Sequence, residues 1–165
     1  MFKPHAIQTG LLAAALLVAG SLQSCGGAGA QTSPPAATGG SLQRMSYTAI
    51  LGPAAGPYSH GVKANGLLYM SGLSAFASPA QGKGTAEQLA EVLKQLTAVA
   101  QAENTDLGSL AKVTIFVTSL DDLAGIRAAL EAAYKGKYPA SSLIQVAGLF
   151  HPSINVEVEA VFAIP

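Results

Sequence analysis

The sequence predicts an α+β domain over residues 47–165, in which two helices pack on one face of a mixed β-sheet. Three observations support this prediction. An Asn-Gly turn joins two strand-like runs, two segments carry apolar residues at helical spacing, and later runs alternate apolar with polar side chains. Stacking helices on one sheet face buries the apolar side of each element. A chain of this length can support a real core.

Five strands are predicted. The first two flank the hairpin turn Asn65-Gly66, which is favoured because both turn residues must accept a positive φ. The other three are expected at residues 111–118, 142–149 and 155–164, where β-branched and aromatic residues are frequent. The last strand has two distinct faces. One carries Val156, Val158, Ala160 and Phe162, and the other carries Glu157, Glu159 and Val161.

Two helices are predicted between these strands. The first opens at Thr85, with Gln88 completing a capping box, and stops at Asn104-Thr105-Asp106. The second starts from Ser119 with Asp122 and is closed by Gly136. Their apolar stripes are Leu89, Val92, Leu93, Leu96, Val99 and Ala100 in the first helix, and Leu123, Ile126, Leu130 and Tyr134 in the second. The other sheet face has no cover in this prediction, and we expect packing between subunits to cover it.

The first 24 residues are typical of a secretory signal peptide. A single Lys3 precedes an apolar run at residues 11–20, well short of the roughly 20 residues that span a bilayer. Leu22-Gln23-Ser24-Cys25 resembles the bacterial lipobox, and Cys25 is the only cysteine in the chain. A secreted chain with one cysteine forms no internal disulfide, so lipidation would account for Cys25. An ordinary signal peptide with an incidental cysteine is the alternative.

Residues 25–46 are predicted to be the lipidated Cys25 followed by a flexible linker. This stretch is rich in Gly, Ala, Ser and Pro and has no apolar period, so it cannot bury enough surface to offset the entropy of ordering. The lipobox resemblance implies that an aspartate after the cysteine retains a lipoprotein in the inner membrane, and Gly26 stands there instead. We therefore expect a periplasmic domain anchored through Cys25, with the outer membrane as its location.

The charge of the chain argues against nucleic-acid binding. The chain has 9 Lys and Arg against 9 Asp and Glu, and no basic cluster supplies the electrostatic footprint that nucleic-acid binding needs. Charged residues make up only 11% of the chain, against about 25% in ordinary domains, which favours a surface covered by other subunits. His60 and His151 lack the spacing of a metal site, so neither a metal nor another cofactor is expected.

The segment that opens the domain is Gly56-Pro57-Tyr58-Ser59-His60-Gly61. It is similar to the Gly-Pro-Tyr-Ser-Gln-Gly motif of the RidA/YjgF family. The resemblance continues, in order, through Asn65-Gly66, Ser71-Gly72, residues 113–117, Pro139-Ala140 and Val156-Glu157-Val158-Glu159-Ala160. It therefore extends over nearly all of residues 47–165.

The resemblance implies a chorismate-mutase-like fold, in which three copies turn their sheets inward to form a barrel with three clefts between subunits. It also implies an activity, because members of the family hydrolyse reactive enamines and imines, such as 2-aminoacrylate, to a keto acid and ammonia. In the family an arginine grips the substrate carboxylate through two parallel hydrogen bonds. A glutamate near the imine carbon positions or deprotonates the attacking water.

The chain departs from the family pattern at that arginine. Ser141 stands in its place after Pro139-Ala140, and Gly148 stands where a second basic residue often follows. Leu143 aligns with the residue whose backbone carbonyl helps to hold the substrate. Losing a charge-assisted bidentate pair costs on the order of 3 kcal/mol, or about a hundredfold in binding. The resemblance therefore implies an altered specificity, with Ser141 and Leu143 in the substrate-binding corner.

Other parts of the family apparatus are present. Glu157 matches the glutamate that handles water, although a polar residue on a half-exposed strand face is the alternative. Tyr58 matches a tyrosine that lines the cleft, and Gly72 is a further candidate for substrate binding. Arg127 on the second helix is either a substitute for the missing cation or a solvated surface residue. His60 replaces the family glutamine, and we expect it to be a surface or hydrogen-bonded structural histidine.

Two classes of function fit these observations. The first is a deaminase-like hydrolase of enamines or imines, with altered specificity because of Ser141. The second is a non-catalytic envelope protein that binds a neutral or aromatic small molecule in the same cleft, or that acts as a chaperone. In either case the expected partners are two further copies of the chain, a small molecule and the membrane, and nucleic acid is not expected.

Overall fold

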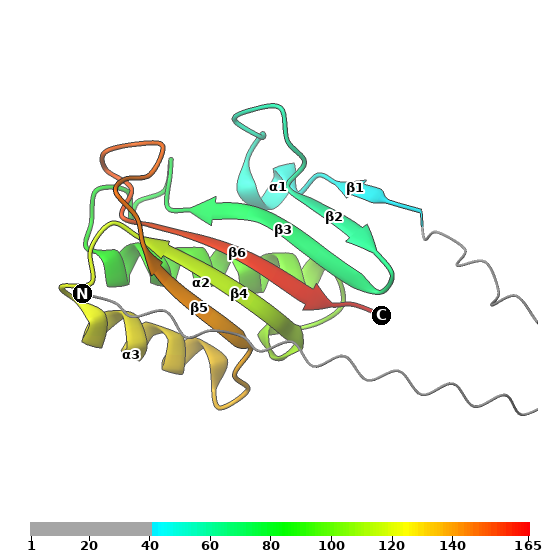
Figure 1. Ribbon diagram of the computed structural model, residues 1–165. Helices are drawn as coiled ribbons and strands as arrows, with labels where there is room; N and C mark the ends of the chain where they lie inside the picture. The colour runs from blue at the N-terminus through cyan, green and yellow to red at the C-terminus, as the bar shows by residue number, and fades with distance from the viewer. Residues whose placement is uncertain (1–40) are drawn as a thin grey trace, which may run out of the picture. The chain divides into compact units, whose positions relative to one another are not determined.

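Six strands form one mixed sheet in a computed structural model of the protein, which describes residues 41–165 (Figure 1). The strands are β1 Gln43–Met45, β2 Gly61–Ala64, β3 Leu67–Ser74, β4 Leu110–Val117, β5 Ala140–Gln145 and β6 Val156–Ala163. Their order is β1-β2-β3-β6-β4-β5, and only β4 and β5 run parallel. The predicted α+β class and mixed sheet are confirmed. The predicted signal peptide and Cys25 lie outside the described residues.

The two predicted helices are α2 Thr85–Ala102 and α3 Leu123–Tyr134. α2 contacts β3 and β6, and α3 packs beside α2 (Figure 1). Two shorter helices are also present, α1 Thr48–Leu51 and the 3-10 helix η1 Leu107–Ser109. Each is too short to show the apolar repeat by which a helix is identified in a sequence. None of the helices in residues 41–165 has the length and apolarity needed to cross a bilayer.

The core lies between the sheet and the helices. β6 is hydrogen-bonded to β3 on one side and to β4 on the other, and its predicted apolar face is buried. A fully buried Val, Leu, Ile or Phe side chain contributes about 1.5–3 kcal/mol relative to an exposed one. The fully buried side chains with the largest volumes include Phe162, Leu68, Leu89, Leu96, Ile115 and Ile126. The predicted alternation of β6 therefore directs Val158 and Phe162 to the helices and Glu157 to the other face.

The predicted hairpin is confirmed. Asn65 and Gly66 have φ values of 50° and 74°, and Ala64 pairs with Leu67 on either side of them. β4 and β6 each differ from their predicted ranges by one residue at both ends. β5 differs more, because it begins at Ala140 and ends at Gln145, whereas the prediction placed it at residues 142–149.

The capping box predicted for α2 is wrong by one residue. Gly84 is the cap, and its backbone N–H donates to the Glu87 carboxylate at 3.3 Å. Gln88 is instead fully buried. Its side-chain amide donates to the carbonyls of Lys83 at 2.9 Å and Ser153 at 3.0 Å. Gln88 thus ties the start of α2 to the loop before β6.

The predicted start of α3 is also corrected. Asp122 caps the helix by accepting a hydrogen bond from the Gly125 N–H at 3.0 Å. Ser119 does not cap it, because its hydroxyl accepts from the Asp121 N–H at 3.0 Å in the turn before. The helix ends as expected for a left-handed cap, since Lys135 and Gly136 have φ values of 49° and 84°.

The predicted linker extends too far toward the domain. β1 lies within residues 25–46 and pairs with β2, so that Arg44 faces Val62. A contact between Tyr47 and Glu103 reinforces this attachment. The hydroxyl of the buried Tyr47 donates a hydrogen bond to the Glu103 carboxylate at 2.8 Å. Lys63 forms an ion pair with the same carboxylate. The fold therefore begins by Gln43, because backbone pairing stabilises a segment whose side chains show no apolar period.

Two tyrosines give a prediction about stability. The Tyr134 hydroxyl is buried without a hydrogen-bond partner in the described part of the chain, and burial raises the pKa of Tyr134 to about 12. Because an unsatisfied buried hydroxyl costs about 1–3 kcal/mol, Tyr134→Phe should raise the free energy of unfolding in urea by about 1 kcal/mol.

Tyr47→Phe is the matched control. It removes a hydroxyl that donates to a carboxylate, so it should lower the free energy of unfolding by about 1–2 kcal/mol. An equal loss in both variants would contradict the absence of a partner for Tyr134.

Candidate active site

A cleft of about 420 Å³ lies along the free edge of β3. β2 pairs with β3 only as far as Met70, so the residues that follow in β3 have no strand on that side. The loop after α1 faces this edge instead. We call this hollow the Glu157 cleft, and its lining includes Tyr58, His60, Gly72, Phe76, Phe150 and Glu157. The structure thus brings together three predicted site residues, Tyr58, Gly72 and Glu157.

Glu157 reaches the cleft because of its place on β6. It pairs with Ser74 of β3 and Phe116 of β4, on the face that the helices do not cover. The β3–β6 register shifts between Met70 and Leu73, and Gly72 lies in this irregular stretch. A Cβ atom on Gly72 would overlap the Glu157 carboxyl group. Glycine therefore leaves the space that the carboxylate occupies.

The environment of Glu157 suits it to accept a proton. Burial raises the pKa of its carboxyl group, and the charge of Glu159, two residues along the same strand, raises it further. A carboxylate whose pKa is raised toward neutrality is a stronger base than a solvated one. Such shifts are typical of catalytic groups.

His60 lines the cleft and is buried. Its Nδ1 accepts a hydrogen bond from the backbone N–H of Tyr47 at 2.9 Å. Because a backbone N–H can only donate, Nδ1 is unprotonated and the ring proton lies on Nε2. The expectation of a hydrogen-bonded structural histidine therefore describes this contact, and the side chain also forms part of the cleft wall.

Aromatic rings form the rest of the wall, and two of them belong to none of the motifs in the sequence. Tyr58, Phe76 and Phe150 are all exposed. The rings of Phe76 and Phe150 meet edge to face, with centroids 5.4 Å apart. Phe76 and Phe150 lie in separate loops that no motif connects, so nothing in the sequence alone indicates that they meet.

Ser141, Leu143 and Arg127 do not line the Glu157 cleft of their own protomer. Ser141 pairs with Val113 and Leu143 with Ile115, both of which point into the core. Their side chains therefore lie on the opposite side of the sheet from Glu157. Arg127 is exposed on α3 and forms no ion pair within residues 41–165.

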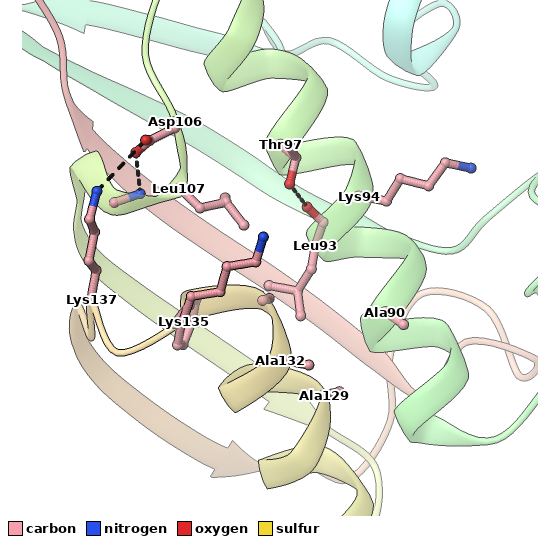
Figure 2. Close-up of a pocket in the computed structure, with 13 residues that line it drawn as sticks. Ala90, Leu93, Lys94, Thr97, Asp106, Leu107, Ala129, Ala132, Lys135 and Lys137 are labelled. Atoms are coloured by element: carbon pink, nitrogen blue, oxygen red, sulfur yellow. Dashed lines mark hydrogen bonds and ion pairs between the residues drawn. The ribbon is translucent and has the colours of Figure 1, made fainter.

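A larger groove of about 510 Å³ lies between α2 and α3 (Figure 2). Lys94, Lys135 and Lys137 lie around it, and Lys137 is 3.8 Å from the Asp106 carboxylate. The Thr97 hydroxyl is already used, because it donates to the Leu93 carbonyl at 2.7 Å. The groove contains none of the predicted site residues, and we therefore assign the candidate active site to the smaller Glu157 cleft. No cluster of His, Cys, Asp and Glu in the described residues could hold a metal ion.

Comparison with known proteins identifies the family. The sequence model described as Endoribonuclease L-PSP (Ribonuc_L-PSP) matches residues 49–164. The chain belongs to this family. Relatives in this family include proteins named as imine deaminases and a solved RidA structure. The predicted resemblance to RidA proteins is therefore confirmed.

The relatives of the chain include proteins that are named for an activity. The chain is 32% identical over 116 residues to the 2-iminobutanoate/2-iminopropanoate deaminase of Escherichia coli K12, covering 66% of this chain and 89% of that one. The human protein of that name is 29% identical over 124 residues, covering 73% and 89%. The RutC family protein y4sK of Sinorhizobium fredii is 36% identical over 115 residues, covering 67% and 90%.

Solved structures of the family share the fold. RidA from the Antarctic bacterium Psychrobacter sp. PAMC 21119 superposes with a TM-score of 0.62 at 28% identity, covering 68% of this chain and 92% of that one. Yeast Mmf1 superposes with a TM-score of 0.67 at 25% identity, covering 76% and 100%.

The contact between Gly72 and Glu157 gives a prediction. Gly72→Ala should displace the Glu157 carboxyl group from the cleft, because the new methyl group would occupy its place. The displaced group is the end of a flexible side chain, so the melting temperature should change little. A crystal structure of the variant checks the displacement, and an unmoved carboxylate would contradict it.

Proposed function

We propose that the protein is an imine or enamine deaminase that works in the Glu157 cleft. The observation that carries the proposal is the Glu157 carboxylate, partly buried at the β3 irregularity in a cleft that it shares with Tyr58. Relatives named as 2-iminobutanoate/2-iminopropanoate deaminases support it. The reaction converts an imine and one water into a carbonyl compound and ammonia.

Glu157 supplies the acid–base chemistry in this proposal. Its carboxylate accepts a proton from water while the water oxygen bonds to the imine carbon. Glu157 passes this proton to the nitrogen. The C–N bond then breaks with its electron pair on nitrogen, and the second proton of the water moves from the hydroxyl group to the nitrogen as the carbonyl forms, which gives ammonia. Tyr58 and His60 form the walls that position the imine.

We propose a homotrimer as the working state. The sheet face that α2 and α3 leave uncovered carries Tyr69, Phe116, Ile144 and Val161, and of these Tyr69 and Ile144 are exposed. Exposed apolar side chains on a broad sheet face mark a surface for association. A complete site that uses both Ser141 and Glu157 also needs more than one protomer, because these residues lie on opposite sides of the sheet.

A non-catalytic binding protein is the second candidate. The aromatic walls of the cleft favour it, because Phe76 and Phe150 can hold a neutral or aromatic ligand without any chemistry. A purified trimer that binds such ligands but accelerates the hydrolysis of no imine would support this function over the first.

We further propose that the protein is a lipoprotein of the outer membrane that faces the periplasm. The lipobox-like residues ending at Cys25 support this location. Radiolabelled palmitate should enter the protein in a bacterial host and be absent from a Cys25→Ser variant. Equal labelling of both proteins would reject the proposed anchor.

Glu157→Gln tests the proposed base. The amide cannot accept the proton, so kcat/KM for imine hydrolysis, measured as ammonia release, should fall by about 100-fold or more. Glu159→Gln is the matched control, since Glu159 is exposed on the same strand and face. Equal losses in both variants would contradict a specific role for Glu157.

The pH dependence gives a second check on the same two variants. The wild-type kcat/KM should fall with decreasing pH at a value above that of an ordinary glutamate, because protonation removes the base. Glu159→Gln should move this limb to lower pH, since Glu159 raises the pKa of Glu157.

The raised pKa of Glu157 also affects stability. When a carboxyl group has a higher pKa in the folded state than in the unfolded state, the protein becomes less stable as the pH rises through that pKa. Glu157→Gln should therefore raise the melting temperature at neutral pH but not at acidic pH.

Ser141→Arg tests the altered specificity. If the missing guanidinium limits the binding of 2-imino acids, its return should raise kcat/KM for 2-iminopropanoate by about 100-fold. Ser142→Arg, on the next residue of β5, is the matched control, because its side chain lies on the other side of the sheet. No gain in Ser141→Arg, or an equal gain in both, would contradict this role of the position.

A further inference from the structure

The Glu157 cleft lacks a partner for a substrate carboxylate. Of the cleft-lining residues in the described chain, Glu157 is the one Asp, Glu, Lys or Arg. Within one protomer, a carboxylate bound there would lose water without gaining a cation, and Glu157 would repel it. Arg44 lies in a separate hollow of about 200 Å³, whose lining shares Tyr58 and His60 with the cleft. These two side chains stand at the boundary between Arg44 and the cleft.

The same cleft offers aromatic surface. Tyr58, Phe76 and Phe150 are exposed, and the edge-to-face contact of the two phenylalanines leaves ring surface open to a ligand. Aromatic groups pack on such rings at centroid distances of about 4.5–7 Å. An iminium ion would also be attracted by the ring faces and by the Glu157 carboxylate.

We infer that the preferred substrates are imines that carry an aromatic group and no carboxylate, namely the N-unsubstituted aldimines that form when arylalkylamines are oxidised. This inference rests on the proposed function and names its substrate class. The aromatic group of such a substrate would pack on the Phe76 and Phe150 rings, and its cationic C=N group would lie beside the Glu157 carboxylate. A 2-imino acid adds a second anion that no group in the cleft compensates.

The reaction balances without an oxidant or a cofactor. An aldiminium ion and one water give the aldehyde and one ammonium ion. The water oxygen bonds to the imine carbon and gives one proton to Glu157, which passes it to the nitrogen. The C–N bond breaks with its electron pair on nitrogen. Glu157 takes the hydroxyl proton as the C=O bond forms and passes it to the departing ammonia, which leaves as ammonium. Because such imines arise when a primary amine is oxidised, an amine-oxidising reaction would supply them.

Four imines, compared with the full chain, separate the two substrate features. An amine oxidase generates the imines of phenylacetaldehyde and acetaldehyde in place, and an amino-acid oxidase generates 2-imino-3-phenylpropanoate and 2-iminopropanoate. The two imines from each oxidase differ in the phenyl ring, and imines with the same side chain from the two oxidases differ in the carboxylate. The rate of ammonia release above the rate in buffer gives kcat/KM. The phenylacetaldehyde imine should be hydrolysed at least about tenfold more efficiently than either the acetaldehyde imine or 2-imino-3-phenylpropanoate.

Phe150→Ala tests the aromatic wall. It should lower kcat/KM about tenfold for the phenylacetaldehyde imine and much less for the acetaldehyde imine, which has no ring to pack on the wall. Tyr138→Ala is the control, because Tyr138 is 68% exposed, comparable to the 63% of Phe150, and does not line the cleft. Equal effects of Phe150→Ala on both imines, or equal effects of the two variants, would overturn the role of the wall.

The remaining outcomes separate this inference from the proposed function. If the carboxylated imines are hydrolysed as well as the aldimines or better, the substrate class is wrong while the deaminase function holds. Loss of that activity in Arg44→Gln would then show that Arg44 receives the carboxylate. If no imine is hydrolysed faster than in buffer, the proposed function fails and the substrate class fails with it.

Discussion

The alternation of side chains along β6 is the constraint on which the site depends. This strand is paired on both sides, so its register is fixed by β3 and β4 together. A slip of one residue would turn Glu157 and Glu159 into the core and expose Val158 and Phe162. Burying two carboxylates without partners costs several kcal/mol each. The hydrophobic core therefore places the carboxylate as firmly as it holds the fold.

The same constraint explains why the carboxylate is not simply solvated. Glu157 lies beside the irregular stretch of β3, where Gly72 lets its side chain approach the backbone. The approach removes water, and Glu159 adds a like charge, so the ionised form is disfavoured. Such an arrangement costs stability at neutral pH, and in the proposed function it supplies the base, a compromise that is common at functional sites.

The sequence predicted the elements whose signals are periodic or local. The β6 alternation, the Asn65-Gly66 turn and the stripe of α2 each follow from one run of residues. The prediction failed where contacts between residues far apart in the sequence determine the structure. β1 has no apolar pattern and forms because β2 offers it a free edge, and Gln88 was assigned to a cap although it bonds the loop before β6. The cleft shows the same division, since Glu157 and Tyr58 lie in motifs whereas Phe76 and Phe150 meet only through the fold.

The position of Ser141 in the sheet constrains the role that we propose for it in specificity. Ser141 pairs with Val113, which points into the core, so its side chain projects to the helix side of the sheet. Glu157 pairs with Phe116 and projects to the uncovered side. The side chain at position 141 therefore cannot reach the Glu157 cleft of its own protomer. If this position sets specificity, it acts on the Glu157 cleft of a neighbouring copy. A substitution at Ser141 would then change substrate choice while leaving the environment of the base in the same protomer intact.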